Sequence, residues 1–247
     1  MPERNFNDFV NRLDACPTYP NTVRTTLATV HGYPIDRLLI GHPSLPTVLL
    51  TGGVHGDEPA GVETVLRFLQ TDIEPMLKHF RFFIIPCINP AGYAANTREN
   101  GEGLDINRAF DAEDVAEANA IKRVLEGNRF LFHQDMHEDY DATGSYFYEG
   151  RKDQNWILPE IALKTLSLCP FDTHQEDGAL DQPIAKGVYQ VDPAWGLAGM
   201  VCYTLAFHTD HVVMPETASS VFDLDRRVAV HLLTLNHVLA HYASRKT

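Results

Sequence analysis

The sequence lacks the features that mark several large classes of protein. Its longest apolar runs fall far short of the ~20 residues that a membrane-spanning helix needs. It has no cluster of basic residues, and 33 acidic against 20 basic residues give a net charge of −13. We therefore expect neither a membrane nor a nucleic acid as a partner. No internal repeat, low-complexity tract or linker interrupts the 247 residues, which predicts a single domain, residues 1–247.

Cysteine is scarce, and none of it is arranged for a disulfide framework or a CxxC metal site. The four cysteines lie far apart, at Cys16, Cys87, Cys169 and Cys202. The first residues, MPERNFNDFVNRLD, are polar and have no apolar core of the kind that a secretion signal carries. We expect free thiols in a reducing compartment, and therefore a cytoplasmic protein.

Apolar runs typical of strands alternate with amphipathic segments typical of helices. The expected strands are residues 23–30, 35–40, 48–50, 81–88, 129–136, 188–191 and 211–214. The expected helices are residues 5–15, 60–70, 111–125, 155–168 and 223–241. Residues 197–207 are compatible with either, and the glycine- and asparagine-rich residues 89–106 are expected to form a long loop. This alternation predicts an α/β fold with a mixed, mainly parallel sheet covered on both faces.

The segment TVLLTGGVHGDEP, residues 47–59, combines a buried strand with polar residues at its end. His55 and Glu58 offer an imidazole and a carboxylate three residues apart, a pairing that suits Zn²⁺. Gly52 and Gly53 allow backbone geometry that a β-carbon would obstruct, so both side chains can converge on one ion. By itself an HxxE pair is weak evidence, because such pairs also occur by chance.

A third metal ligand is expected at the end of the strand 129–136, in the sequence QDMHED. His137 is preferred, because the end of a strand is the more open place. His133 remains an alternative, since its even spacing from His137 puts both on one face of a strand. His137 could also be no more than a polar residue at a strand terminus.

The loop at residues 89–108 and a late strand supply the other polar candidates. Arg98 and Arg108 carry planar guanidinium groups that can pair with a carboxylate or stabilise an oxyanion, and Asn107 adds an amide. A plain surface ion pair between Arg108 and Asp105 is the simpler alternative. Glu216 follows the strand HVVMP, where it can act as a general base beside a metal; it could also be an ordinary surface glutamate.

Five short motifs occur in one order along the chain: HGDE, NPAGY, R-x8-NR, DMH and PET. In this order they resemble the zinc carboxypeptidase family, which includes the succinylglutamate desuccinylase and aspartoacylase branch. The resemblance runs from about residue 47 to residue 216. It implies a three-layer α/β/α sandwich of the phosphorylase/hydrolase type, with a mixed, mainly parallel eight-stranded sheet.

The resemblance also implies roles for particular residues. One zinc ion per chain would be held by His55, Glu58 and His137. Arg98 would polarise the scissile carbonyl, Asn107 and Arg108 would bind a terminal carboxylate, and Glu216 would be the general base and acid. The family's carboxypeptidases also use a tyrosine on a mobile loop; Tyr189, beside Gly187, is preferred for it over Tyr203, which is expected in the core.

We therefore expect a zinc metallohydrolase, a metallocarboxypeptidase-like protease that cleaves an amide next to a free carboxylate. Its substrate would be a short peptide or an N-acyl amino acid. The short length and cytoplasmic character favour an N-acyl amino acid deacylase, whereas the NPAGY and PET motifs favour a peptidase. A non-catalytic module that binds a metal or a peptide terminus is the alternative from another class; the presence of Glu216 and both arginines argues against it.

Overall fold

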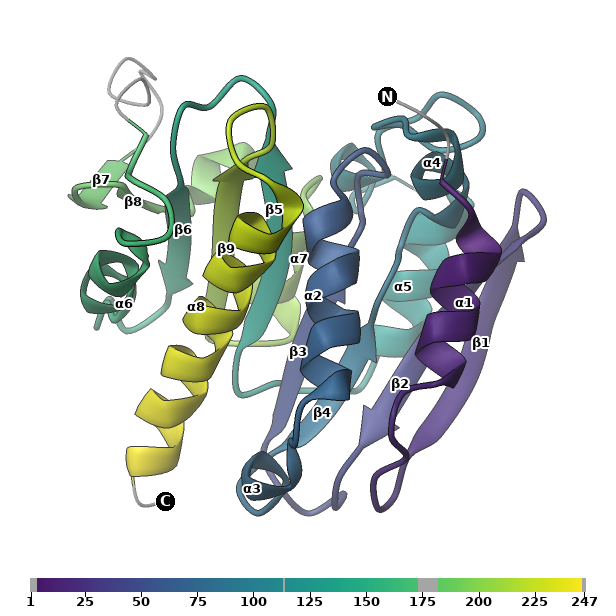
Figure 1. The fold of residues 1–247 in the computed structure, drawn as a ribbon, viewed down its shortest axis with the longest axis horizontal. Coiled ribbons are helices and arrows are strands. Elements are labelled where there is room, and N and C mark those ends of the chain that lie inside the picture. Colours follow the sequence, from purple (N-terminus) through teal and green to yellow (C-terminus); the bar gives the residue numbers. More distant parts are fainter. Residues whose placement is uncertain (1–3, 113, 173–181, 246–247) are drawn as a thin grey trace.

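The computed structural model describes residues 4–112, 114–172 and 182–245. These residues form one nine-stranded sheet with the order β1-β2-β4-β3-β5-β9-β6-β8-β7 (Figure 1). The strands are β1 (Val23–Val30), β2 (Tyr33–Ile40), β3 (Thr47–Gly52), β4 (Arg81–Ile85), β5 (His133–Asp139), β6 (Tyr146–Arg151), β7 (Gln182–Ala185), β8 (Val188–Gln190) and β9 (His211–Ala218).

The sheet is mixed, with a parallel centre. Strand β3 pairs in parallel with β4 and β5, and β5 pairs in parallel with β9. Antiparallel pairs flank this centre, β1 with β2 and β2 with β4 at one side, and β6 with β9 and β7 with β8 at the other. The α/β class and the mixed sheet are confirmed, but the expected count of eight strands is wrong.

Two strands, β6 and β7, were not predicted from the sequence patterns. In β6 every residue is buried, so it lacks the alternation that marks a half-exposed strand. Strand β7 is only four residues long and contains Pro183, which is tolerated because β7 lies at the edge of the sheet.

Helices cover both faces of the sheet and make it the middle of three layers. Figure 1 shows α1, α2 and α8 across the front, and α5 and α7 behind. The helices are α1 (Phe6–Asp14), α2 (Pro59–Gln70), α3 (Glu74–Leu77), α4 (Pro90–Ala95), α5 (Ala116–Leu125), α6 (Leu158–Thr165), α7 (Met200–Phe207) and α8 (Leu224–Ser244), with 3₁₀ turns η1 (Ile106–Arg108) and η3 (Pro193–Trp195). No helix in the described ranges has the length and apolar character needed to cross a membrane.

The alternation of side chains along β3 divides the core between the two faces. Val48 and Leu50 pack with α2 and α8, whereas Leu49 packs with α5 on the opposite face. All three side chains are buried. The strand that leads to the HGDE segment is therefore fixed from both sides.

The segments that the sequence left open or assigned to a loop are partly helical. Residues 89–106 contain α4, which begins at Pro90, and the side chain of Asn89 accepts the backbone N–H of Gly92 at its start. The NPAGY motif is thus a helix start, which the glycine and asparagine content concealed. The ambiguous residues 197–207 form α7 over most of their length.

Candidate metal centre and active site

The HGDE segment lies between the end of β3 and the start of α2, and its backbone fits only because of glycine. A β-carbon on Gly52 would lie 2.7 Å from the backbone carbon of Gly61 in α2. Gly53 has a φ of +63°, in the left-handed region that glycine favours. Strand and helix therefore approach backbone to backbone, and the loop between them carries His55 and Glu58.

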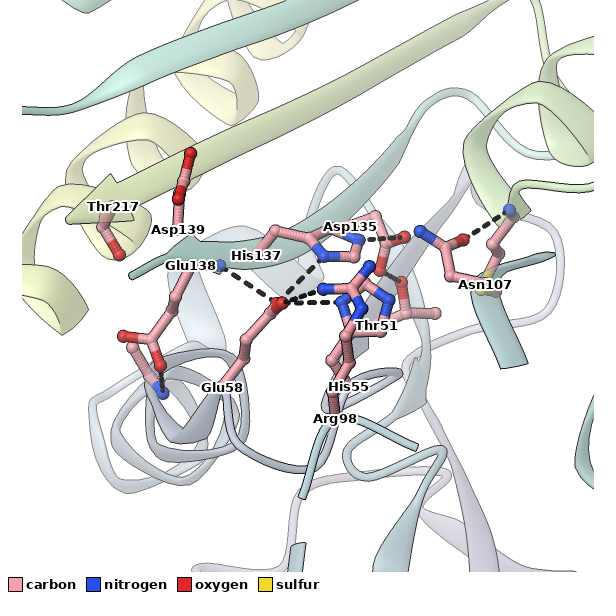
Figure 2. A network of polar contacts seen from close by, with 12 residues as sticks. Thr51, His55, Glu58, Arg98, Asn107, Asp135, His137, Glu138, Asp139 and Thr217 are labelled. Carbon is pink, nitrogen blue, oxygen red and sulfur yellow. Dashed lines mark hydrogen bonds and ion pairs between the residues drawn. The ribbon is translucent and has the colours of Figure 1, made fainter. Parts of the chain in front are cut away.

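His55, Glu58 and His137 converge on one point, with one potential ligand atom from each within 4.8 Å of the others. The Nδ1 atom of His55 lies 2.6 Å from one Glu58 oxygen, and the Nδ1 atom of His137 lies 3.0 Å from the other (Figure 2). All three side chains are buried. His137 lies inside β5, not after its end as expected, because the strand continues to Asp139.

The second ring nitrogen of each histidine faces a carboxylate. His55 Nε2 lies 3.1 Å from Asp105, and His137 Nε2 lies 3.1 Å from Asp135. If these carboxylates accept the Nε2 protons, both Nδ1 lone pairs are left facing Glu58. Two nitrogens and a carboxylate oxygen then meet with no proton between them, a donor set that fits a divalent cation and suits zinc.

The electrostatics of the cluster also favour positive charge. Burial opposes the charged form of His137, but Asp135 and Glu58 outweigh it and raise the pKa of His137 well above its usual value. Burial likewise opposes charge on Glu58, yet His55 and His137 together lower the pKa of Glu58 far below its usual value. The site therefore keeps Glu58 ionised and stabilises cationic charge beside it.

His133, the alternative ligand, has other partners. Its ring lies 2.7 Å from the hydroxyl of Thr51 and 2.9 Å from that of Thr204. Burial lowers the pKa of His133 to about 4. His133 lies on the same face of β5 as His137, as its even spacing predicts. Its two ring nitrogens, however, contact Thr51 and Thr204 and not Glu58.

Glu216 reaches the site through the register of the sheet. In β9 it is paired with His137 of β5 on one side and with Tyr146 of β6 on the other. Paired residues on neighbouring strands project from the same face of a sheet, so Glu216 and His137 share a face. Within the described part of the chain the Glu216 carboxylate has no hydrogen-bond partner, and it lines a cavity of about 750 Å³. Burial, with the nearby charges of Glu58 and Asp139, raises the pKa of Glu216.

The basic side chains expected at the site line the same cavity. Arg98 contacts Asp105 at 3.1 Å and Glu58 at 3.5 Å, which places its guanidinium beside the metal cluster. Arg108 is exposed and donates to the carbonyl of Asn107. The ion pair of Asp105 is thus with Arg98, and not with Arg108 as the simpler alternative supposed.

Asn107 is oriented by the start of α7. Its side-chain oxygen accepts the backbone N–H of Met200 at 2.8 Å. Figure 2 shows its amide nitrogen pointing back toward Asp135 and His137. The amide can therefore donate into the cavity.

Tyr189 does not lie on a loop. It belongs to β8, is buried, and its ring packs at 5.8 Å from that of Tyr148 and 6.4 Å from that of Tyr146. Among the described residues the aromatic wall of the cavity is formed by Tyr140, Tyr146, Tyr148 and Trp195, with Tyr189 behind it. The expected position on a loop is wrong: Gly187 forms a tight turn between β7 and β8, and Tyr189 follows it inside β8. Tyr203 packs against Phe110 beside a core cluster, as expected of a core tyrosine.

Several partners of the site were not recognised in the sequence. Asp135 and Asp105 hold the two histidines, and the signal for Asp135 was its position two residues before His137 on the same face of a strand. Glu138 points to the other face, where it accepts the N–H of Ala60 and pairs with Arg227. Burial raises the pKa of Glu138 to about 7, although Arg227 opposes the shift. Only the fold brings Arg227 to this place.

Comparison with known families agrees with this geometry. Residues 44–163 match the model of the succinylglutamate desuccinylase/aspartoacylase catalytic domain. The resemblance to zinc carboxypeptidases, near the desuccinylase and aspartoacylase branch, is confirmed. The matched residues include the HGDE loop and His137, so the family model covers all three members of the metal cluster.

Individual relatives of the chain are distant. Murein peptide amidase A of Escherichia coli K12 is 36% identical over 75 residues, which is 30% of this chain and 30% of that protein. A solved protein of Shewanella denitrificans OS217, provisionally described as a metallopeptidase, superposes with a TM-score of 0.79 at 22% identity, over 96% of this chain and 87% of that one. A metallo-carboxypeptidase from Burkholderia cenocepacia gives a TM-score of 0.73 at 16% identity, over 99% and 70%. The solved structures establish the shared fold.

Proposed function

We propose that the chain, as a single catalytic domain, is a zinc-dependent hydrolase that cleaves an amide bond next to a free carboxylate. The observation that carries this proposal is the position of Glu216. Its carboxylate shares a sheet face with His137, has no partner among the described residues, and lines the cavity beside the metal cluster. A carboxylate in this position can exchange protons with a molecule bound at the cluster.

His55, Glu58 and His137 would hold one zinc ion. Bound zinc lowers the pKa of a coordinated water toward ~7 and polarises a carbonyl group. Glu216 would accept the proton of the attacking water and pass it to the leaving nitrogen. The raised pKa of Glu216 suits the second transfer, because a weaker acid holds the proton until the amine departs.

The two arginines at the site, Arg98 and Arg108, would have different roles. Arg98, next to Glu58, would stabilise the negative charge that develops on the carbonyl oxygen. Arg108, with the amide of Asn107, would bind the carboxylate of the substrate, since a guanidinium and a carboxylate form paired hydrogen bonds. This pairing would place the scissile amide next to a free carboxylate. The substrate would be a short peptide, as in a metallocarboxypeptidase.

A second candidate is an N-acyl amino acid deacylase. The family model that matches residues 44–163 favours it, because that model describes the desuccinylase and aspartoacylase domain. The two candidates share the metal cluster, Glu216 and the carboxylate-binding residues, and they differ in the acyl group. A non-catalytic metal-binding module would keep the cluster and lack turnover.

Metal content and turnover of the purified protein test the proposal. We expect about one zinc per chain, lost in His55→Ala, and hydrolysis of short peptides with a free carboxylate. Glu216→Gln should keep the zinc and lower kcat by roughly 10²–10⁴-fold, the usual contribution of a general acid–base group. Unchanged turnover in Glu216→Gln would refute its role. Zinc binding without hydrolysis of any peptide or N-acyl amino acid would instead support the non-catalytic metal-binding module.

A further inference from the structure

The lining of the cavity includes side chains of both charges. Asn107 and the cationic Arg108 contribute to it, and so do the acidic Asp139 and Asp141. Figure 2 shows Asn107 and Asp139 on opposite sides of His137. If the carboxylate of the substrate binds at Arg108, the part on the acyl side of the scissile amide extends past the metal cluster toward Asp139.

The carboxylate of Asp139 is held in a fixed position by donors that carry no charge. One oxygen accepts the hydroxyl of Tyr146 at 2.8 Å. The other accepts the backbone N–H groups of Asp141 at 2.8 Å and Ala142 at 3.3 Å. A carboxylate offers about four acceptor positions, so one remains for a ligand. In the ranges that the structure describes, Asp139 forms no ion pair with a cationic side chain, which leaves its charge available within the cavity.

Aromatic rings also line the cavity, and one of them, Tyr146, is hydrogen-bonded to this carboxylate. The rings of Tyr146 and Tyr148 meet edge to face at 5.7 Å, and those of Tyr148 and Trp195 at 5.1 Å. Ring faces attract cations, and an ammonium group shielded by such a wall is bound more strongly than one in water. A fixed carboxylate and aromatic walls together favour a small organic cation over a second acid.

We propose that Asp139 binds a free ammonium group on the acyl side of the scissile amide. Asp139 lies two residues beyond His137 on the same face of β5, a step of ~7 Å along a strand. One extended aminoacyl residue spans ~3.5 Å and a hydrogen bond to Asp139 adds ~3 Å, so the two together cover this step. The inference rests on the proposed function and selects within it: the substrates are zwitterionic short peptides, and acyl groups without a cation, such as succinyl or acetyl, are disfavoured.

Peptide binding to the zinc-loaded Glu216→Gln protein, which should not turn over its ligand, tests the inference. The probes are a dipeptide with a free amine and its N-acetyl counterpart, both with a free C-terminal carboxylate, measured by calorimetry. We expect the free-amine dipeptide to bind roughly 10-fold tighter or more, as for a hydrogen bond between charged groups. Adding Asp139→Asn should remove this preference and leave the affinity for the N-acetyl peptide unchanged.

Asp72→Asn is the matched control. Asp72 also accepts the backbone N–H two residues ahead, it lies in an exposed turn before α3, and its replacement removes the same charge. It should leave both affinities unchanged. Tyr146→Phe, which removes one contact of Asp139 and keeps the charge, should weaken the preference only in part. Equal binding of the two peptides, tighter binding of the N-acetyl form, binding of neither, or a preference that survives Asp139→Asn would each overturn the inference.

Turnover by the zinc-loaded wild-type protein separates the two proposals. Hydrolysis of both peptides at similar kcat/KM would keep the hydrolase and reject the ammonium site. Selective binding of the free-amine dipeptide without hydrolysis of either peptide would keep the ammonium site and reject the hydrolase.

Discussion

Asp105 connects two parts of the site that the sequence treats as separate. One of its oxygens lies 3.1 Å from His55 Nε2 and accepts the backbone N–H of Asn107 at 2.9 Å. Its other oxygen pairs with Arg98. Burial opposes the charged form of Asp105, but His55 and Arg98 outweigh burial and lower the pKa of Asp105 far below its usual value. A single carboxylate thus orients a metal-ligand candidate, a guanidinium and the turn that carries Asn107.

Replacing Arg108 by alanine should mainly weaken binding of carboxylate-bearing substrates. A hydrogen-bonded ion pair contributes about 1.5–3 kcal/mol, so kcat/KM should fall roughly 10–100-fold through KM. Substrates whose carboxylate is esterified should be affected far less. Arg129→Ala, which removes an exposed arginine paired with Asp210, is the control. Equal losses on the acid and the ester would contradict the role of Arg108.

At the scale of residues, the sequence predicts side chains that carry chemistry better than those that hold them. His55, Glu58, His137, Arg98, Asn107, Arg108 and Glu216 line one cavity as the motifs imply. Tyr189 does not belong to that group, because it lies in strand β8 and not on a loop. Asp105 and Asp135 were missed, because an aspartate that supports an imidazole has no motif of its own.

At the scale of elements, backbone contacts position the HGDE loop. A β-carbon on Gly56 would lie 2.0 Å from the backbone carbon of Gly92 in α4. The carbonyl of Gly56 also accepts a hydrogen bond of 2.7 Å from Arg4. The HGDE loop is therefore packed directly against the NPAGY helix, which explains in physical terms why both motifs contain glycine.

Gly56→Ala should disturb this contact and reduce metal binding. The added methyl group meets backbone and not a flexible side chain, so we expect a loss of about 3 kcal/mol in the free energy of unfolding. Gly199→Ala, also at the cavity, is the control: its β-carbon would have no neighbour closer than 3.7 Å. Urea unfolding and zinc content of both variants give the comparison. Normal zinc content and stability in Gly56→Ala would contradict this account.

His231 in α8 makes stability depend on pH. Burial, together with the positive charges of His137 and Arg227, lowers the pKa of His231 to about 3. Below pH ~6.5 the unfolded chain gains a proton at this position and the folded chain does not. The stability associated with neutral His231 is thus present above pH ~6.5 and is lost as the pH falls toward 3.

Replacing His231 by glutamine should flatten this dependence. Relative to the wild type, the variant should lose roughly 1.4 kcal/mol less of its unfolding free energy for each pH unit below 6.5. Urea unfolding at pH 7, 6 and 5 measures the slope. His42→Gln, at an exposed position, should leave the slope unchanged. Parallel slopes for wild type and His231→Gln would rule out a contribution from His231.

At the scale of the whole molecule, alternating strands and helices predict the three layers, because buried strands and amphipathic helices have distinct patterns. The patterns fail where tertiary contacts override them. Strand β6 is buried throughout, β7 is a short edge strand, and α4 begins within a glycine-rich stretch. The strand order, which brings β9 between β5 and β6, cannot be read from local patterns at all.

Metal removal should destabilise the entire fold, because the cluster joins the end of β3 to the middle of β5. A ligand present at 1,000 times its Kd adds about 4 kcal/mol. For a protein of this size that corresponds to a fall in Tm of about 10 °C on chelation. Zinc should restore the original Tm in the wild type and have no effect on His55→Ala. An identical Tm with and without chelator would argue against a metal ion bound at the cluster.

The metal-ligand candidates come from the β3–α2 loop and from β5, whereas Glu216 comes from β9. A shift of β9 by one residue would turn every one of its side chains to the opposite face of the sheet. Such a misfolded species would still bring the three metal-ligand candidates together, but Glu216 would no longer face them. A preparation can therefore be fully loaded with metal and yet only partly competent, and titration of competent sites, rather than metal content, measures how faithfully the chain has folded.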